Sequence, residues 1–345
     1  MRIGLIARAD RTGLGIQTYE FYRHMNPSKV LVVDLSHCSG QRPNAEMYPN
    51  GVVWHDGRYP GVEIFHDPVV DEFLEDLDIV FTCETPYSYY LYIKAKEMGV
   101  KTVQQFNYEF LDFLYHKNLP FPDLLASPST WHLDEVKQRF PTRVEHLPVP
   151  VNREAVPFKR RDKLRKILHT AGTPAVEDRN GTLTLIEAMR HVKSDVSLEV
   201  KTQKHIEVTA PLVKTIINFG KPDNYSDLYG DHDAFVMPRK FGGLCLPMNE
   251  AASAGMVVIS SKVSPQTEWL PEGVLVDTHV SKQIMTKTMI DINETDPIKL
   301  AEKIDELAGD ENLFGKLSDH MNELADELDW KKMRLKYLEV FESLL

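Results

Sequence analysis

The residues best suited to chemistry lie in the segment from Asp233 to Gly255, where an apolar run, a pair of glycines and a helix-like stretch follow one another. Gly242 and Gly243 let the backbone approach a ligand closely. The helix expected near Pro247 offers free N–H groups and the positive end of its dipole. Glu250 lies one turn into that helix, where it can accept hydrogen bonds from hydroxyl groups. The segment therefore predicts a cradle for an anion that also carries hydroxyls, and a tight turn without a ligand is the alternative.

A second set of polar residues follows two apolar runs in the first half of the chain. Cys83–Tyr87 come after one run and Gln104–Glu109 after the next. The carboxyl ends of parallel strands form the edge at which open α/β sheets bind ligands. Glu84 and Glu109 are therefore candidates for binding or activating a hydroxyl group, and Asn107 is the third catalytic candidate. Each glutamate could equally be a helix N-terminal charge or a salt-bridge partner.

The elements that must position these residues alternate between short strands and helices, which is typical of doubly wound parallel sheets. The sequence predicts helices at Gly15–His24, Pro68–Leu77 and Tyr87–Met98, the last ended by Gly99. Strands are expected in the first half at Arg2–Ala7, Val30–Leu35, Asp78–Cys83, Lys101–Phe106 and Asp123–Ala126.

The alternation restarts after the proline-containing segment Leu147–Val151, which favours extended backbone. Strands are then expected at Lys166–Thr170, Ser197–Thr202, Lys214–Asn218, Asp233–Met237, Val257–Ser260 and Val274–Val276. The last residues place Trp330, Met333, Tyr337 and Phe341 on one helical stripe. We therefore expect Rossmann-like domains at residues 1–152 and 153–328, and a docked amphipathic helix at 329–345.

Composition excludes several classes of protein. The net charge is −11, 42% of residues are hydrophobic and 26% are charged, as in an ordinary soluble chain. The apolar runs are too short to span a bilayer. Three cysteines without CxxC spacing favour a reducing compartment, so a cytoplasmic location is expected and zinc is not. Asp76-Leu77-Asp78 and Asp231-His232-Asp233 each precede an apolar strand, so they read as turns and no metal site is predicted.

The segment Asp233–Gly255 resembles the donor-site motif of GT-B glycosyltransferases, especially the retaining GT4-like family, which reads Glu-Gly-Phe-Gly-Leu-Pro-x-x-Glu-Ala-x-Ala-x-Gly. Further resemblances to this family lie at Arg8–Tyr19, Glu145–Asn152, Asn180–Ala188 and in the helix that begins at Trp330. The resemblance implies an acceptor-binding first domain, a donor-binding second domain and a last helix that crosses back to the first domain. It implies a nucleotide-diphosphate sugar as co-substrate, no metal and no other cofactor.

The donor-binding residues carried over from the family or offered as substitutes are Gly13, Gly15, Gly172, Thr173, Arg179, Asn180, Arg239, Lys240, Gly242, Gly243, Leu244, Cys245, Leu246 and Glu250. Three positions depart from the family. Gly242 stands where the motif begins with glutamate, Thr173 replaces an arginine, and Asn180 replaces a lysine. Those two cations neutralise the donor diphosphate, whose developing charge needs electrostatic stabilisation.

Arg179, Arg239 and Lys240 are the candidate substitutes for the missing cations. Arg239 and Lys240 are favoured because they lie nearer to the glycine loop in the sequence. For this pair, an ordinary surface location is the alternative.

The leading hypothesis is a metal-independent, retaining glycosyltransferase whose acceptor is a glycan, a lipid-linked sugar, a small molecule, a protein or a modified nucleic-acid base. A non-catalytic sugar-nucleotide or glycan binding protein is the second hypothesis. The nucleic-acid option draws on the basic run between Lys159 and Lys166, which otherwise reads as a solvated linker. A dehydrogenase is disfavoured because the loop containing Gly13 and Gly15 lacks the third glycine of Gly-x-Gly-x-x-Gly.

Overall fold

The chain forms two compact units, each built on its own sheet. The computed structural model describes residues 1–10, 12–40, 42–58, 64–115, 119–172, 176–208, 211–220 and 225–345. The first unit comprises Met1–Val149, Thr286–Thr288 and Lys331–Leu345, and the second comprises Pro150–Met285 and Met289–Trp330. The chain thus passes from the first unit to the second within the proline-containing segment.

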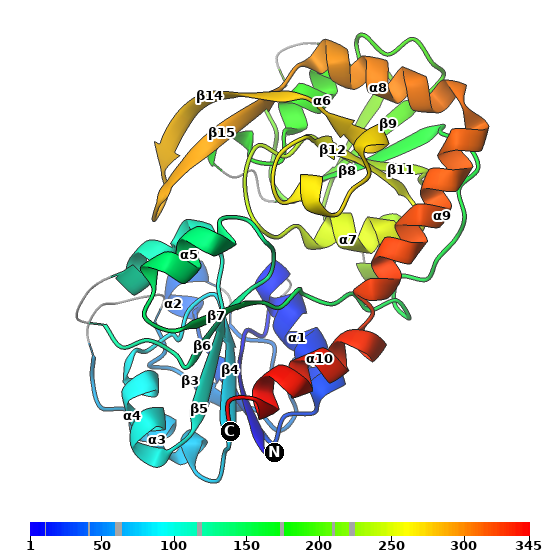
Figure 1. Ribbon diagram of the computed structural model, residues 1–345. Helices are drawn as coiled ribbons and strands as arrows, with labels where there is room; N and C mark the ends of the chain where they lie inside the picture. Colours follow the sequence, from blue (N-terminus) through cyan, green and yellow to red (C-terminus); the bar gives the residue numbers. More distant parts are fainter. Residues whose placement is uncertain are drawn as a thin grey trace. The chain divides into compact units, whose positions relative to one another are not determined.

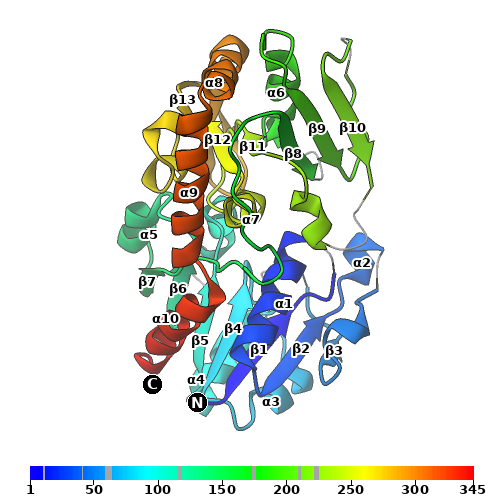
Figure 2. The same cartoon turned by 90° about the vertical axis from the view of Figure 1, so that its right-hand side faces the viewer.

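The first unit is a parallel sheet in the order β3-β2-β1-β4-β5-β6-β7 (Figure 2). Its strands are β1 Ile3–Ala7, β2 Lys29–Val33, β3 Val52–Trp54, β4 Ile79–Cys83, β5 Lys101–Gln105, β6 Leu124–Ser127 and β7 Arg143–His146. Its helices include α1 Gly13–Met25, α2 Ser36–Ser39, α3 Pro68–Leu74, α4 Tyr90–Met98 and α5 Leu133–Arg139. Every residue of β1 and β4 is buried, as expected for central strands with helices on both faces.

Local sequence signals set the helix ends of the first unit. The Thr12 hydroxyl accepts a hydrogen bond from the Gly15 N–H at the start of α1. Asp67 caps α3, and Pro68 occupies its first turn. Gly99 ends α4 in the left-handed region with φ +74°, which confirms the predicted stop.

The last helix, α10 Trp330–Glu342, lies beside α1 in the first unit (Figure 1). Phe21 of α1 stacks on Phe81 of β4 at 4.3 Å, and the rings of Tyr337 and Phe341 lie about 6 Å from both. The Tyr337 hydroxyl donates to the Pro148 carbonyl oxygen at 3.1 Å. The predicted apolar stripe is therefore buried, and Lys331–Leu345 belong to the first compact unit.

The second unit is a parallel sheet in the order β10-β9-β8-β11-β12-β13 (Figure 2). Its strands are β8 Lys166–Gly172, β9 Ser197–Thr202, β10 Thr215–Phe219, β11 Ala234–Met237, β12 Val257–Ser261 and β13 Leu275–Val276. Its helices include α6 Thr182–Ala188, α7 Leu246–Ser253, α8 Pro297–Gly309 and α9 Glu311–Glu327. One core cluster joins the buried faces of this sheet to α6, α7, α8 and α9.

An antiparallel hairpin between β13 and α8 was not predicted. It pairs β14 Thr278–Met285 with β15 Met289–Thr295. Most of β14 is exposed, whereas Ile290 and Ile292 of β15 are buried. The hairpin therefore lacks the full apolar alternation by which a strand is recognised in a sequence.

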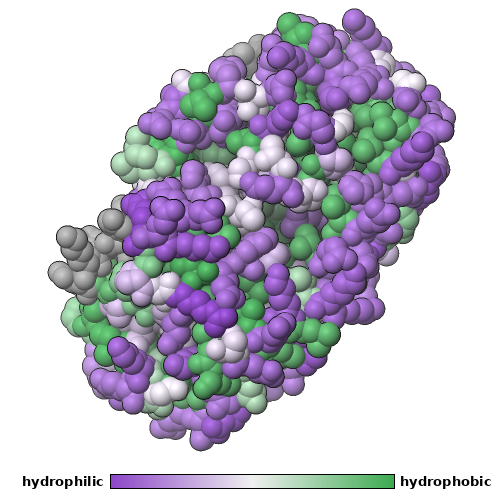
Figure 3. Space-filling model, viewed as in Figure 1, coloured by the Kyte–Doolittle hydropathy of each residue, from purple (hydrophilic) through white to green (hydrophobic). Residues whose placement is uncertain are grey.

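The predicted fold class, α/β with two Rossmann-like domains, is confirmed by these two sheets. Hydrophilic residues cover most of the face shown in Figure 3. Within the described residues, none of the helices has both the length and the apolar character needed to cross a bilayer.

Candidate functional site

The predicted anion cradle lies at the switch point of the second sheet. Strand β8 lies between β9 and β11, so the connections after β8 and β11 leave the sheet in opposite directions. A crevice at the carboxyl ends of such strands is where open α/β sheets bind ligands. The loop after β11 carries Arg239–Leu244, and the loop after β8 leads to Arg179 and Asn180.

Arg239 holds the glycine loop from inside. Its side chain is 2% exposed, Nε donates to the Phe241 carbonyl at 2.9 Å, and Nη2 donates to the Leu244 carbonyl at 2.7 Å. Gly242 has φ +113°, and a Cβ there would lie 2.4 Å from Arg239 Nη2. Glycine is therefore required where the loop crosses the guanidinium. The favoured role for Arg239, a clamp on a donor phosphate, does not agree with this inward direction.

Lys240 is also engaged within the protein. Its Nζ lies 2.9 Å from Glu294 Oε1 of β15, and its carbonyl accepts from the Asn293 N–H at 3.1 Å. Its N–H donates to the Arg179 carbonyl at 2.9 Å. This contact ties the loop after β11 to the segment that precedes α6.

Arg179 differs from the other two candidate cations in its surroundings. Its guanidinium carbon lies 5.8 Å from the centre of the Phe241 ring, in the glycine loop, and the residue is partly exposed. Asn180 donates from Nδ2 to the Ala171 carbonyl at 3.2 Å. Gly172 has φ +64°, whereas Thr173 lies outside the described residues. Arg179 is thus the candidate cation that packs on an aromatic ring of the glycine loop.

Glu250 is held in place by a tyrosine. The carboxylate is 8% exposed, and its Oε2 accepts a 2.5 Å hydrogen bond from the Tyr229 hydroxyl. Cys245 precedes α7, and no described side chain caps the first turn of this helix. The helix therefore presents backbone N–H groups beside an oriented carboxylate, an arrangement that suits a ligand with both phosphate and hydroxyl groups.

His169 fixes the spacing of the two strands and α6 at the crevice. It is fully buried on β8, its Nδ1 donates to the Val236 carbonyl of β11 at 2.8 Å, and its Nε2 lies 2.9 Å from the Thr182 hydroxyl. Burial lowers the pKa of His169 to about 4, so the ring is neutral near pH 7. Gly181 packs closely against Pro238, because a Cβ on Gly181 would lie only 2.2 Å from the Pro238 carbonyl oxygen.

The first sheet also has a switch point, between β1 and β4. Arg8, just past β1, contacts Asp10 Oδ2 through Nε at 2.9 Å and Nη2 at 2.7 Å. Burial opposes the charge of Arg8, but Tyr87, Asp10 and Glu84 outweigh it and raise the pKa of Arg8. A Cβ on Gly15 would lie 2.0 Å from the Asp10 carbonyl, so this turn needs glycine, whereas Gly13 is open on that side.

The acceptor-side candidates follow β4 and β5. The Asn107 Nδ2 donates to Glu84 Oε1 at 3.2 Å, and Glu84 has φ +66°. Glu109 lies in the same turn as Tyr108 and is 5% exposed. The structure therefore brings Glu84 and Asn107 together beside Arg8, while Glu109 is buried.

Sequence reasoning missed Arg8, Asp10, His169 and Tyr229 as members of these sites. Arg8 and Asp10 follow β1 directly, so the edge rule that selected Glu84 would also have selected them. His169 and Tyr229 carry no comparable signal, because they lie inside apolar or mixed segments. Among the described residues, no group of three or more His, Cys, Asp or Glu side chains could hold a metal ion.

Comparisons with known proteins bear on the fold and on the class of protein. Residues 165–310 match the family model described as Glycosyl transferases group 1. No curated protein matches the sequence. Among solved structures, a glycosyltransferase from Rickettsia africae aligns with a TM-score of 0.71 at 13% identity, over 99% of this chain and 98% of that chain.

Two further structures align over nearly their whole length. Anabaena HepE in complex with UDP-glucose gives a TM-score of 0.70 at 11% identity, over 99% of this chain and 100% of that chain. Sucrose-phosphate synthase from Thermosynechococcus elongatus gives a TM-score of 0.68 at 12% identity, over 100% of this chain and 99% of that chain. These likenesses confirm the GT-B fold. The family match lies within the second unit, at residues 165–310, and together with this fold it supports a transferase.

Proposed function

We propose that this glycosyltransferase moves a sugar from a nucleotide-diphosphate donor to a hydroxyl-bearing acceptor. The observation that carries the proposal is the cradle of the second unit, where an uncapped helix follows a glycine loop and Glu250 is oriented by Tyr229. Backbone N–H groups suit the phosphates and the carboxylate suits the ribose hydroxyls. UDP is the natural first probe, because HepE, of the same fold, is described with UDP and UDP-glucose.

The finer features of the reaction belong to the same proposal. Transfer proceeds with retention and without a metal ion, as the resemblance to GT4-like enzymes implies. The first unit binds the acceptor through Glu84 and Asn107 at its switch point. The acceptor class stays open, and the expected location is cytoplasmic.

The test of the donor site is calorimetric titration of UDP into the wild-type protein, Glu250→Ala and Tyr229→Phe. Losing a hydrogen bond to a charged group costs about 1.5–3 kcal/mol, so Glu250→Ala should weaken UDP about 10- to 150-fold. Tyr229→Phe keeps the carboxylate and should cost less. UDP affinity that is the same in Glu250→Ala and the wild type would contradict the assignment.

A non-catalytic binding protein is the second candidate, favoured by the positions that lost charge. Asn180 stands where the family has lysine, and Arg239 and Lys240 are engaged within the protein. Hydrolysis of a panel of nucleotide sugars separates the two functions: release of UDP supports the enzyme, and tight UDP binding without release supports the binder.

The nucleic-acid option has less support from the basic run. Arg160 pairs with Asp162 and with Asp319, and Arg161 is buried and donates to the Gly230 carbonyl at 3.1 Å. These cations stabilise the second unit itself. Lys163 and Arg165 are exposed, and binding that weakens steeply with salt would be needed to support this acceptor.

A further inference from the structure

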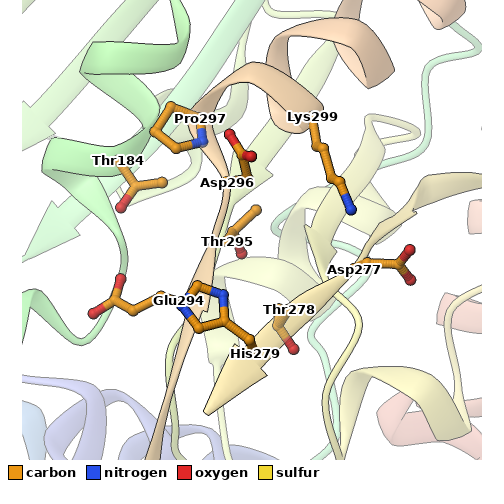
Figure 4. Close-up of a pocket in the computed structure, with 9 residues that line it drawn as sticks. All are labelled: Thr184, Asp277, Thr278, His279, Glu294, Thr295, Asp296, Pro297 and Lys299. Carbon is orange, nitrogen blue, oxygen red and sulfur yellow. The ribbon is translucent and has the colours of Figure 1, made fainter. Parts of the chain in front are cut away.

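A cavity of about 500 Å³ lies in the second unit at the junction of α6, the hairpin and α8 (Figure 4). Thr184 and Pro297 line one side and Asp277 lines the other, with Thr295 between them. Its volume is within the range of small-molecule sites. None of its lining residues belongs to the cradle after β11, so it is a separate site.

We propose that this cavity binds a neutral polyhydroxylated ligand, of the size of a mono- or disaccharide. The first argument is the state of its carboxylates, each of which has a partner within the protein. Glu294 pairs with Lys240 at 2.9 Å, Asp277 lies 3.8 Å from Lys262 Nζ, and Asp296 caps α8 by accepting from the Ile298 N–H at 2.8 Å. Because each carboxylate already has a partner, the cavity exerts little attraction on a cation. The carboxylate oxygens can still accept hydrogen bonds from the hydroxyl groups of a ligand.

The second argument is the mixture of groups on the walls. Threonine hydroxyls together with Lys299 and His279 supply donors, and the carboxylates supply acceptors. The Pro297 ring and the threonine methyl groups supply apolar surface for the C–H faces of a sugar ring. A diphosphate would meet the carboxylates at close range and be repelled, so the cavity does not suit the proposed donor. Within the described part of the chain, the side chains form no cluster that could hold a metal.

The third argument is the connection of the cavity to the loop after β11. Glu294 lines the cavity and holds Lys240, whose N–H in turn holds the Arg179 carbonyl at 2.9 Å. A ligand hydroxyl that hydrogen-bonds to the Glu294 carboxylate competes with the Lys240 ammonium group and so changes the position of Lys240. The ligand therefore acts as an effector of the nucleotide site. This effector role rests on the proposed function, whereas the binding of a sugar to the cavity is independent of it.

The binding test uses glucose and maltose as probes, with spermidine and inorganic phosphate as contrasting ligands. Saturation-transfer NMR at about 10 mM detects ligands with dissociation constants near 1 mM. The test variant is Thr184→Phe, which fills the cavity from α6. Leu183→Phe is the matched control, because Leu183 is the neighbouring residue on α6, is 47% exposed and does not line the cavity.

We expect a sugar signal in the wild type and in Leu183→Phe, and its loss in Thr184→Phe with an unchanged thermal midpoint. A signal that survives in Thr184→Phe would place the sugar elsewhere and overturn the proposal. No signal from either sugar, or displacement of the sugar by spermidine or phosphate, would overturn the ligand class. Should Thr184→Phe fail to fold, Thr184→Val replaces it and should weaken the sugar signal by removing one hydroxyl.

The effector role is tested by UDP titration with and without a saturating concentration of the sugar that binds. Coupling between sites typically changes affinity at least about fivefold, and Glu294→Gln should abolish the change. An unchanged UDP affinity with the sugar bound would overturn the effector role. Absence of UDP binding in both titrations would instead count against the proposed donor site, so the two failures are distinguishable.

Discussion

Arg179 and Arg239 should respond differently to substitution: both were candidate cations in the sequence, which favoured Arg239, but the structure places them in different surroundings. Arg179 lies over Phe241 at the edge of the glycine loop and is partly exposed. Its removal deletes the cation that lies over the glycine loop, where the donor phosphates are proposed to bind. A hydrogen bond to a charged group contributes about 1.5–3 kcal/mol, so Arg179→Ala should lower kcat/KM about 10- to 150-fold. Arg179→Lys keeps the charge and should retain more activity.

Arg239→Ala removes a buried side chain that holds two backbone carbonyls. The Phe241 and Leu244 oxygens lose their donors at 2.9 and 2.7 Å, and each buried unsatisfied group costs about 1–3 kcal/mol. A total near 3 kcal/mol corresponds to a fall in Tm of about 6–12 °C for a unit of this size. Activity should fall as well, because the loop loses its shape.

The assay combines thermal unfolding with donor turnover on UDP-sugars for each variant. The expected pattern is a normal Tm with low turnover for Arg179→Ala, and a low Tm with low turnover for Arg239→Ala. Full turnover in Arg179→Ala together with a normal Tm and no turnover in Arg239→Ala would refute the reasoning. That pattern would indicate that Arg239 contacts the donor phosphate, which is the role that the sequence alone favoured for it.

Three further outcomes follow from the same contacts. In the folded protein the pKa of His169 is lowered to about 4, so the unfolded state binds the proton first as the pH falls below 6.5. The free energy of unfolding should therefore decrease between pH 7 and pH 5. In urea titrations, His169→Gln should reduce this decrease by about 2 kcal/mol, and an equal decrease in both proteins would contradict the role of His169. EDTA should leave turnover unchanged, and restoration by Mg²⁺ after its loss would disprove metal independence. Asn107→Ala removes one hydrogen bond from the Glu84 carboxylate and should raise the acceptor KM several-fold without changing UDP affinity by calorimetry.

Much of the fold could be predicted because the central strands are continuous apolar runs. The runs at β1, β4 and β11 are buried on both faces, which leaves a clear signal in the sequence. The missed strands lack that signal. β3 has only three residues, and β14 is largely exposed, so tertiary pairing rather than local pattern determines them.

The sequence predicted where the glycine loop and α7 lie along the chain, but not the directions of their side chains. The glycine loop, Glu250 and the start of α7 lie where the motif placed them. The role of Arg239 depends on which carbonyls lie within its reach, and this is set by the φ of Gly242 at +113°. Lys240 likewise finds Glu294, 54 residues further along the chain, on a strand that was not predicted. Contacts of this kind depend on tertiary structure and leave no local pattern.

The geometry of the cradle and its charge are supplied by different residues. Gly181 against Pro238, neutral His169 and buried Arg239 fix the shape, and none of them offers a charge to the crevice. In the proposed function, binding of a nucleotide would draw on that shape, on backbone N–H groups and on Glu250. Departure of a diphosphate adds negative charge in the transition state, which shape alone does not stabilise. Turnover should therefore depend on Arg179 more than affinity does, and the difference between the two effects decides between an enzyme and a binding protein.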